Sequence, residues 1–184
     1  MSARVQQKEQ TRTRIIDAAA RAIRERGLAK PSVNEVMADA GLTVGGFYAH
    51  FDSKDTLLLE ALRTMFGERM QDWLAKLPEA TPEIRRQQAA RGYLSRKHRD
   101  TGAERCPMPM ILGEIDRADP RIRALIAGYL EDWARALTTT TEVDGRAKAL
   151  AALATMVGAL TLSRALGPTP FSDELLAAAK AAVR

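Results

Sequence analysis

A glycine followed two residues later by a helix-capping hydroxyl constrains this chain more than any other feature, and it occurs at Gly41-Leu42-Thr43. Glycine commonly ends an α-helix because it adopts a left-handed backbone conformation without strain. A threonine at the start of a helix can accept hydrogen bonds from the free N–H groups of the first turn. Only Leu42 separates the two signals. The sequence therefore predicts two short helices joined at a sharp angle, as in a helix-turn-helix.

The second helix of this pair, from Val44 to His50, is predicted to be weak on its own. It contains Gly45 and Gly46, and glycine in a helix interior costs about 1 kcal/mol relative to alanine. Packing of Phe47 and Phe51 is expected to hold it in place. A short helix with a nearly bare first turn suits close approach to a large partner such as DNA.

The preceding residues predict two more helices, so that the weak helix is third in a group of three. Apolar residues follow helical spacing from about Thr11 to Arg26, and Gly27 is expected to end that helix. Ser32 and Glu35 have the spacing of a capping box, in which each side chain bonds the backbone N–H of the other residue. Further on, Ser53 is a good N-cap for a fourth helix.

Together these residues resemble the DNA-binding domain of the tetracycline-repressor (TetR) family. The likeness covers residues 32–62, and it is carried by Gly41-Leu42-Thr43, Phe47-Tyr48-Ala49-His50-Phe51 and Ser53-Lys54. It implies a homodimer whose two short recognition helices enter successive major grooves of double-stranded DNA. It also implies a helical C-terminal domain that dimerises and binds a small apolar inducer. On this basis we expect a repressor that leaves its operator when the inducer binds.

We expect an all-α fold with an N-terminal helix-turn-helix domain (residues 1–53) and a helical ligand-binding and dimerisation domain (residues 54–184). No alternating strand pattern is present. A long helix from Lys54 to Leu77, ended by Pro78, would span roughly 36 Å. It would connect the two domains. Capping and proline signals place the starts of later helices at Thr81-Pro82, Cys106-Pro107, Asp119-Pro120, Asp144 or Thr141, and Ser172. The helix that starts at Cys106-Pro107 is expected to run to Ala118, and a loop is expected at Thr101-Gly102. The chain should thus contain about nine helices.

The family resemblance assigns phosphate contacts to Tyr48, His50 and Lys54, and to the hydroxyl of Thr43. Ser32 is a further candidate for DNA contact. Lys54 at a helix N-terminus adds a cation where free N–H groups already attract anions. Alternatively, His50 is a structural histidine.

Candidates for base contacts are Val44, Gly45, Gly46 and Phe47, and this set contains no Arg, Asn or Gln for bidentate contacts. Specificity would then come from Val44 against a thymine methyl group, from close backbone approach at the glycines, or from DNA shape. Phe47 can equally be a core residue.

Charge alone does not locate the DNA-binding half of the chain, although the formal net charge is +5. Basic residues gather near the N-terminus, led by Arg4, Lys8, Arg12 and Arg14. Phosphate contacts supply most non-specific DNA affinity, so such an arm is useful beside a recognition helix. The alternative is a solvated tail.

The N-terminus has no apolar signal region, and the uncharged stretch 149–163 is shorter than a membrane span. We therefore expect a cytoplasmic protein.

The last two long helices are apolar nearly all round, with Ala149, Leu153 and Val157 on one and a run of alanines from 177 to 182 on the other. A helix of this kind is buried from several sides. They could form the face of a symmetric dimer. The alternative is a monomer core of small residues.

A ligand pocket in a helical domain needs apolar walls and a few polar groups. Residues of suitable type are Met70, Trp73, Tyr93, Cys106, Met110, Tyr129, Trp133 and Met156, each of which could instead be plain core. Cys106 follows Arg105 at a predicted helix start, so it is either a reactive thiol sensor or a packing residue. A regulator controlled by a protein partner, or by modification of Cys106, is the alternative to a pocket ligand.

Catalysis is not expected. The chain has two histidines, His50 and His98, which lie far apart in sequence, and His98 stands in a basic cluster where solvation is its expected role. No metal-ligand spacing, phosphate-binding glycine loop or nucleophile motif is present. We therefore expect no cofactor and no metal site.

Overall fold

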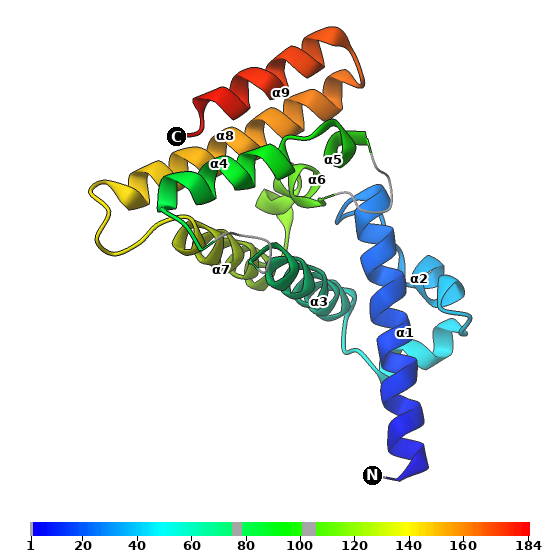
Figure 1. The fold of residues 1–184 in the computed structure, drawn as a ribbon. Coiled ribbons are helices and arrows are strands. Elements are labelled where there is room, and N and C mark those ends of the chain that lie inside the picture. The colour runs from blue at the N-terminus through cyan, green and yellow to red at the C-terminus, as the bar shows by residue number, and fades with distance from the viewer. Residues whose placement is uncertain (1, 75–78, 101–105) are drawn as a thin grey trace.

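The computed structural model of the chain describes residues 2–74, 79–100 and 106–184. Within these ranges it contains nine α-helices, two short 3-10 helices and no strand, so the predicted all-α class is confirmed. The helices are α1 (Ala3–Arg26), α2 (Val33–Asp39), η1 (Val44–Ala49), α3 (Lys54–Leu74), α4 (Pro82–Tyr93), α5 (Arg96–Asp100), α6 (Met108–Leu112), η2 (Ile115–Arg117), α7 (Pro120–Ala136), α8 (Gly145–Leu166) and α9 (Pro170–Ala182). Figure 1 shows α1 and α2 at the opposite end of the molecule from the α8–α9 pair.

The first three helices form the predicted helix-turn-helix arrangement, in which α1 packs on α2 and α2 contacts η1. The capping box is confirmed: Ser32 Oγ accepts from Glu35 N at 3.2 Å, and the Glu35 carboxylate accepts from Ser32 N at 2.9 Å. Gly41 has φ of +68°, and the next residue, Leu42, donates from its N–H to Met37 O, which is the glycine-dependent helix ending expected there.

Two details of the turn differ from the sequence prediction. Thr43 stands at the N-cap position of η1, but its side chain makes no capping hydrogen bond. The short helix itself is a 3-10 helix. Gly45 and Gly46 add no side-chain packing and favour helix poorly, so the segment has no strong preference for the α form.

Other helix boundaries also differ. Helix α9 begins two residues earlier than predicted, because Thr169 Oγ1 accepts from Ser172 N at 3.2 Å and Pro170 takes the first position. Asp144 precedes α8 with φ of +55° and no side-chain capping bond. Helix α6 ends at Leu112 and gives way to η2, whereas one helix to Ala118 was predicted. The predicted helix end at Leu77-Pro78 and the loop at Thr101-Gly102 lie outside the described residues.

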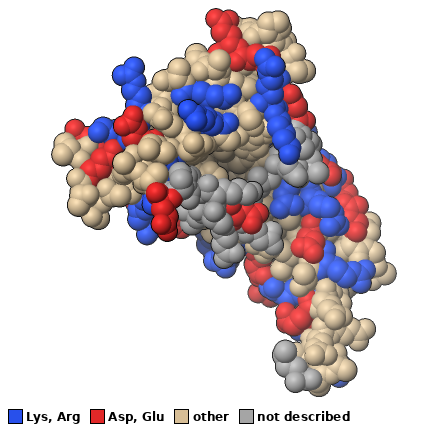
Figure 2. Space-filling view, viewed as in Figure 1, with Lys and Arg blue, Asp and Glu red and all other residues tan. Residues whose placement is uncertain are grey.

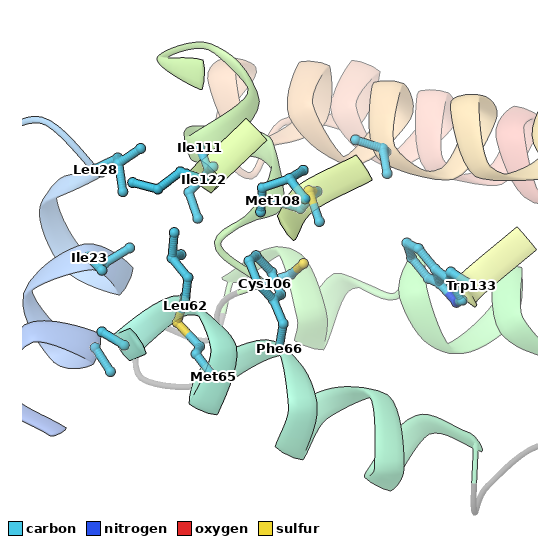
Figure 3. Packing of buried hydrophobic residues seen from close by; sticks show 14 of the residues in the cluster. Ile23, Leu28, Leu62, Met65, Phe66, Cys106, Met108, Ile111, Ile122 and Trp133 are labelled. Carbon is cyan, nitrogen blue, oxygen red and sulfur yellow. The ribbon is translucent and has the colours of Figure 1, made fainter. Parts of the chain in front are cut away.

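A continuous core joins the N-terminal helices to the rest of the chain. Ile23 and Leu28 lie beside Leu62 and Met65 of α3, and Ile111 closes the cluster from α6 (Figure 3). Helix α3 packs on α1 and also on α7. This helix therefore takes part in both halves of the molecule, and the domain boundary between residues 53 and 54 stays a prediction.

Helix α8 is the centre of the C-terminal half and contacts α4, α5, α6, α7 and α9. It is longer than the uncharged stretch 149–163, and by length and composition alone it could cross a membrane. Its buried residues, among them Ala149, Met156 and Leu160, pack against neighbouring helices as in the core of a helical domain.

Two arginines are buried beside α8 and α9. Arg86 is 2% exposed and is bonded to Glu142, and to the main-chain oxygens of Leu137 and Arg184. Arg99 donates to Ser172 Oγ at 2.7 Å and to Asp173 Oδ1 at 2.8 Å. These cations fix α4, α5 and the C-terminal segment relative to one another.

Candidate nucleic-acid interface

The outer surface of η1 offers a mostly bare face with one large side chain. Tyr48 is 75% exposed and Val44 is 42% exposed, and Thr43 and Gly45 are also exposed. The inner surface is anchored by Phe47, which is 1% exposed and stacks on Phe51 with 5.8 Å between ring centroids. The aromatic pair thus presents η1 to solvent, as the sequence predicted.

Burial of Phe47 restricts the candidates for base contacts. Its side chain packs inside the domain and does not reach the exposed face, so its alternative role as a core residue fits the structure. Val44, Gly45 and Gly46 remain on or near the surface.

Neither glycine of η1 is required by the fold. A Cβ atom added at Gly45 would meet no heavy atom within 4 Å, and one at Gly46 would meet only Met37 Cε at 3.9 Å. Neither residue has a positive φ. The lack of side chains therefore has no internal steric reason, and a bare surface allows another molecule to approach the backbone closely.

Polar groups around η1 are left with unused hydrogen-bonding capacity. The buried Nδ1 atom of His50 has no hydrogen-bond partner in the part of the chain that the structure describes. The Thr43 hydroxyl is exposed and makes no capping bond. Ser32 differs, because its exposed hydroxyl already donates to Glu35 Oε2 at 2.8 Å and accepts from Glu35 N at 3.2 Å.

Lys54 lies at the start of α3, where Ser53 Oγ accepts from Thr56 N at 3.1 Å and confirms the predicted N-cap. The Lys54 ammonium donates to Ala29 O in the loop between α1 and α2 at 3.1 Å. This bond holds the cation beside the N-terminal end of the helix, where an anion would also be attracted.

Only part of the predicted basic arm is available to a partner. Arg12 is paired with Glu60 and lies over the Phe51 ring, and Arg14 donates to Ala40 O. Arg4 and Lys8, on the exposed first turns of α1, have no ion pair among the described residues. Figure 2 shows Lys and Arg interspersed with Asp and Glu over α1 and α2.

The C-terminal half brings together several of the predicted pocket residues. Trp133 contacts Trp73 edge-on with 5.2 Å between ring centroids, Tyr93 at 5.1 Å and Tyr129 at 6.3 Å. Phe66 packs on Tyr129 at 4.5 Å and His98 on Tyr93 at 4.7 Å. We call these six residues the aromatic cluster.

The remaining pocket candidates are less closely associated. Met70 and Met156 belong to the core or pack on it, whereas half-buried Met110 does not join the core cluster. Phe66 and His98 were not among the predicted pocket residues. His98 was assigned to a solvated basic segment, but its Nδ1 is 2.7 Å from Tyr93 O and its ring packs on Tyr93. The basic neighbours of His98 in sequence masked this contact.

Cys106 is 7% exposed, and its Sγ lies 3.5 Å from the Tyr93 hydroxyl. Burial raises the pKa of Tyr93 well above its ordinary value, and Cys106 adds to the effect, so the phenol stays neutral. The alternative role of Cys106 as a packing residue fits this burial. Arg105, which was expected to favour the thiolate, lies outside the described residues.

Glu114 connects the two halves of the molecule and was missed in the sequence. Its carboxylate, just before η2, accepts hydrogen bonds from Leu28 N and Ala29 N in the α1–α2 loop, the latter at 3.0 Å. Gly27 has a φ of +89°, which favours glycine, and a Cβ there would lie 2.6 Å from Glu114 Oε1, so the carboxylate would have to shift. No local pattern signals a contact between residues 86 positions apart.

The chain has clear relatives among known proteins. Residues 15–61 match the family described as bacterial regulatory proteins, tetR family. The HTH-type transcriptional regulator TtgR of Pseudomonas putida is 34% identical over 76 residues, 41% of this chain and 35% of that protein. The HTH-type transcriptional repressor KstR2 of Rhodococcus jostii (strain RHA1) is 42% identical over 52 residues, 28% of this chain and 26% of its own. The matched part thus spans about a third or less of these relatives.

Similarity of structure extends over the whole chain. A TetR transcriptional regulator from Chloroflexus aurantiacus J-10-FL superimposes with a TM-score of 0.78 and 26% sequence identity, covering 97% of this chain and 94% of that one. The family match is thus confined to residues 15–61, whereas the shared fold includes the C-terminal helices.

Proposed function

Because the chain belongs to the tetR family of bacterial regulatory proteins, we propose that it is a cytoplasmic, DNA-binding transcriptional regulator, and specifically a repressor released from its operator by a small apolar ligand. The observation that carries the proposal is the outward face of η1, where two glycines that the fold does not require stand beside an exposed tyrosine. Selection of bound sequences from a random duplex library tests it. A chain that enriches no sequence at low ionic strength is not an operator-binding protein.

Phosphate contacts would come from Tyr48, His50, Lys54, Thr43 and Ser32, and base contacts from Val44 and the backbone of Gly45 and Gly46. The exposed phenol of Tyr48 supports its role. The Nδ1 atom of His50 is buried, so a phosphate contact from this half-buried residue would use Nε2. Since phosphate contacts position a protein and base contacts determine sequence preference, this face offers much positioning and little direct base recognition. DNA shape would supply the rest.

Tyr48→Ala and Lys54→Ala are each expected to weaken binding to the selected duplex about tenfold, the effect of losing one hydrogen bond to a charged group. Stability should change little for Tyr48→Ala, because the side chain is mostly exposed. For Lys54→Ala, the slope of log affinity against log salt concentration should fall by about one, which corresponds to the loss of one phosphate contact. Fluorescence anisotropy over a series of salt concentrations measures both. Arg117→Ala, which removes an exposed cation from η2, serves as the control and should keep wild-type affinity and slope.

Exposed apolar side chains on α8 and α9 of the single chain support dimerisation through these two helices. Leu150, Leu162 and Leu166 of α8 and Phe171 of α9 are each more than two fifths exposed. They lie with exposed alanines on two adjacent helices (Figure 1). Leu162 and Leu166 lie one helical turn apart, whereas Leu150 lies on another side of α8. Exposed apolar residues on the surface of paired helices are typical of a protein interface, and a second copy related by a two-fold axis would cover them with the same residues.

Leu162→Glu is expected to convert the protein from a dimer to a monomer, because a charge would be buried at the interface without a partner. The side chain is 56% exposed in the single chain, so the monomer fold should tolerate it. Light scattering after size exclusion measures the mass. Ile84→Glu, at an exposed apolar position on α4, should leave the mass unchanged. A wild-type protein of monomer mass would refute the proposed dimer face.

Communication between ligand and DNA would pass through the α1–α2 loop. Ala29 accepts from Lys54 through its carbonyl group and donates to Glu114 through its N–H. A proposed phosphate-contact residue and a carboxylate from the C-terminal half therefore hold the same residue. A ligand that shifts α6 and η2 would act on this loop, provided that it binds one arrangement more tightly than the other.

A further inference from the structure

Trp133 carries a buried hydrogen-bond donor that has no acceptor. Its side chain lies on α7 and is 4% exposed, and its Nε1 atom finds no hydrogen-bond partner among the described residues. An unsatisfied buried donor costs about 1–3 kcal/mol, and nearly all such groups in native proteins are paired. The indole N–H is thus a group for which a bound molecule would supply the missing acceptor.

The surroundings of this donor are aromatic and come from three helices. Trp73 of α3 meets Trp133 at an interplanar angle of 85°, and Tyr93 of α4 meets it at 58°. Both rings thus pack against Trp133 in the edge-to-face and tilted contacts that aromatic rings prefer. In Figure 3, Trp133 lies on the far side of Cys106 and Phe66 from the Ile23–Leu62–Ile111 part of the core.

Charge near the cluster favours a neutral molecule over a cation. Arg164 donates to Cys106 O at 2.6 Å and to His98 O at 2.8 Å, which places a guanidinium beside two neighbours of Tyr93. Tyr93 itself is held neutral by burial, which raises its pKa. In the described ranges no carboxylate is hydrogen-bonded to Trp133, Tyr93 or Cys106. Aromatic rings can bind cations through their faces, but the Arg164 guanidinium beside this cluster would repel a bound cation.

We propose that the effector is a neutral aromatic molecule with an acceptor oxygen, and that Trp133 Nε1–H donates its hydrogen bond to that oxygen. The rings of Trp73 and Tyr93 would contact the aromatic part of the molecule. This inference rests on the proposed ligand-responsive function and names the chemical class of its ligand.

Three probes of similar size separate the contributions of the aromatic ring, the acceptor oxygen and a positive charge to binding. Acetylnaphthalene has the ring and the acceptor, ethylnaphthalene has the ring alone, and naphthyltrimethylammonium has the ring and a positive charge. Calorimetric titration of the full chain is expected to give acetylnaphthalene about three- to tenfold higher affinity than ethylnaphthalene, the value of one net neutral hydrogen bond. The cation should bind most weakly of the three.

Trp133→Phe removes the donor and keeps an aromatic ring, so it should abolish the preference for acetylnaphthalene over ethylnaphthalene. The ratio of the two affinities is the readout, because altered packing affects both probes. Trp73→Phe removes the other of the two tryptophans and should retain the preference. In the proton NMR spectrum of the wild type, acetylnaphthalene should move the indole N–H signal that Trp133→Phe deletes, whereas ethylnaphthalene should not.

Equal affinities for the ketone and the hydrocarbon in the wild type, tighter binding of the cation, or no binding of the ketone up to its solubility would each overturn this inference. None of these measurements uses DNA, so they are independent of operator binding. If acetylnaphthalene binds through Trp133 but does not release a selected duplex, the ligand class stands and release by this ligand is refuted. If no duplex is selected, the regulatory proposal fails and the indole result is unaffected.

Discussion

Arg86→Met is expected to lower the free energy of unfolding by about 3–5 kcal/mol, the usual effect of removing one partner from a buried ion pair. Arg86 donates to Glu142 at 2.7 and 2.9 Å, to Leu137 O at 3.1 Å and to Arg184 O at 2.7 Å. Methionine fills a similar volume but removes the donor to two carbonyl groups. The Glu142 carboxylate would keep only the hydrogen bond from Thr138 Oγ1 at 3.1 Å and the ion pair with Lys148 at 3.7 Å. Urea unfolding at a fixed protein concentration measures the loss, and the concentration must be fixed because dimerisation would add to stability.

The same substitution should change how stability depends on pH. The hydrogen bond from Arg86 is the main cause that holds the pKa of Glu142 below its ordinary value. A lowered pKa in the folded state contributes stability above the ordinary glutamate value of about 4.3, and this contribution is lost as the pH falls through the lowered pKa. Arg86→Met should therefore flatten the decline in stability below that ordinary value.

Arg146→Met provides the comparison, because it removes an arginine that is exposed and paired with Glu131 at 2.6 Å. Exposed ion pairs contribute little, so its effect should be far smaller than that of Arg86→Met. Equal losses from the two substitutions, or an unchanged acid dependence in Arg86→Met, would show that the Arg86 network does not stabilise the fold in the way described.

Gly45→Leu is expected to weaken binding to the selected duplex about a hundredfold, or about 2.7 kcal/mol, which is within the usual cost of forcing a bulky group into a packed contact. The free protein has room for the side chain, since a Cβ at this position meets no atom within 4 Å. Replacement of a helical glycine should also leave stability unchanged or slightly higher. Anisotropy with the selected duplex and urea unfolding of the free protein measure the two effects separately.

Gly92→Leu is the matched control. Gly92 is an exposed glycine of α4 where an added Cβ would also meet no atom within 4 Å, and it lies away from η1. This variant should bind the duplex as the wild type does. If Gly45→Leu also retains full affinity, DNA does not approach the backbone of η1 closely, and base recognition must be sought elsewhere on the surface.

Several features set by neighbours in sequence were predictable, although the residues expected to cap η1 and α8, Thr43 and Asp144, make no side-chain capping bond. Pairings between distant residues were not predictable. The Ser32–Glu35 box, the Asp119 cap and the helix end at Gly27 each involve residues within four positions, and all three are present. The choice between α and 3-10 form in η1 depends on packing that propensities do not contain. The pairing of Arg86 with Glu142 joins residues 56 positions apart, and helical spacing on either segment gives no sign of it.

Some residues of the proposed sites could likewise be predicted from the sequence, and others could not. Tyr48 and Lys54 could be identified because the family motif is contiguous in sequence. Trp133 and Tyr93 could be named as aromatic residues on apolar faces, but their contact with each other depends on how α4 and α7 cross. His98 was assigned wrongly to solvent, because its charged neighbours in sequence are not its neighbours in space.

The contact between Glu114 and the α1–α2 loop sets a condition for building hybrid biosensors from this protein. A chimera that replaces residues 1–53 with the corresponding segment of another regulator would present a foreign loop to the Glu114 carboxylate. A donor segment with a side chain at position 27 would strain the backbone, which has a φ of +89° there, and would displace the Glu114 carboxylate. A hybrid that exchanges residues 1–53 alone would therefore separate two residues that act together. A working hybrid should contain both the glycine at position 27 and the glutamate at position 114.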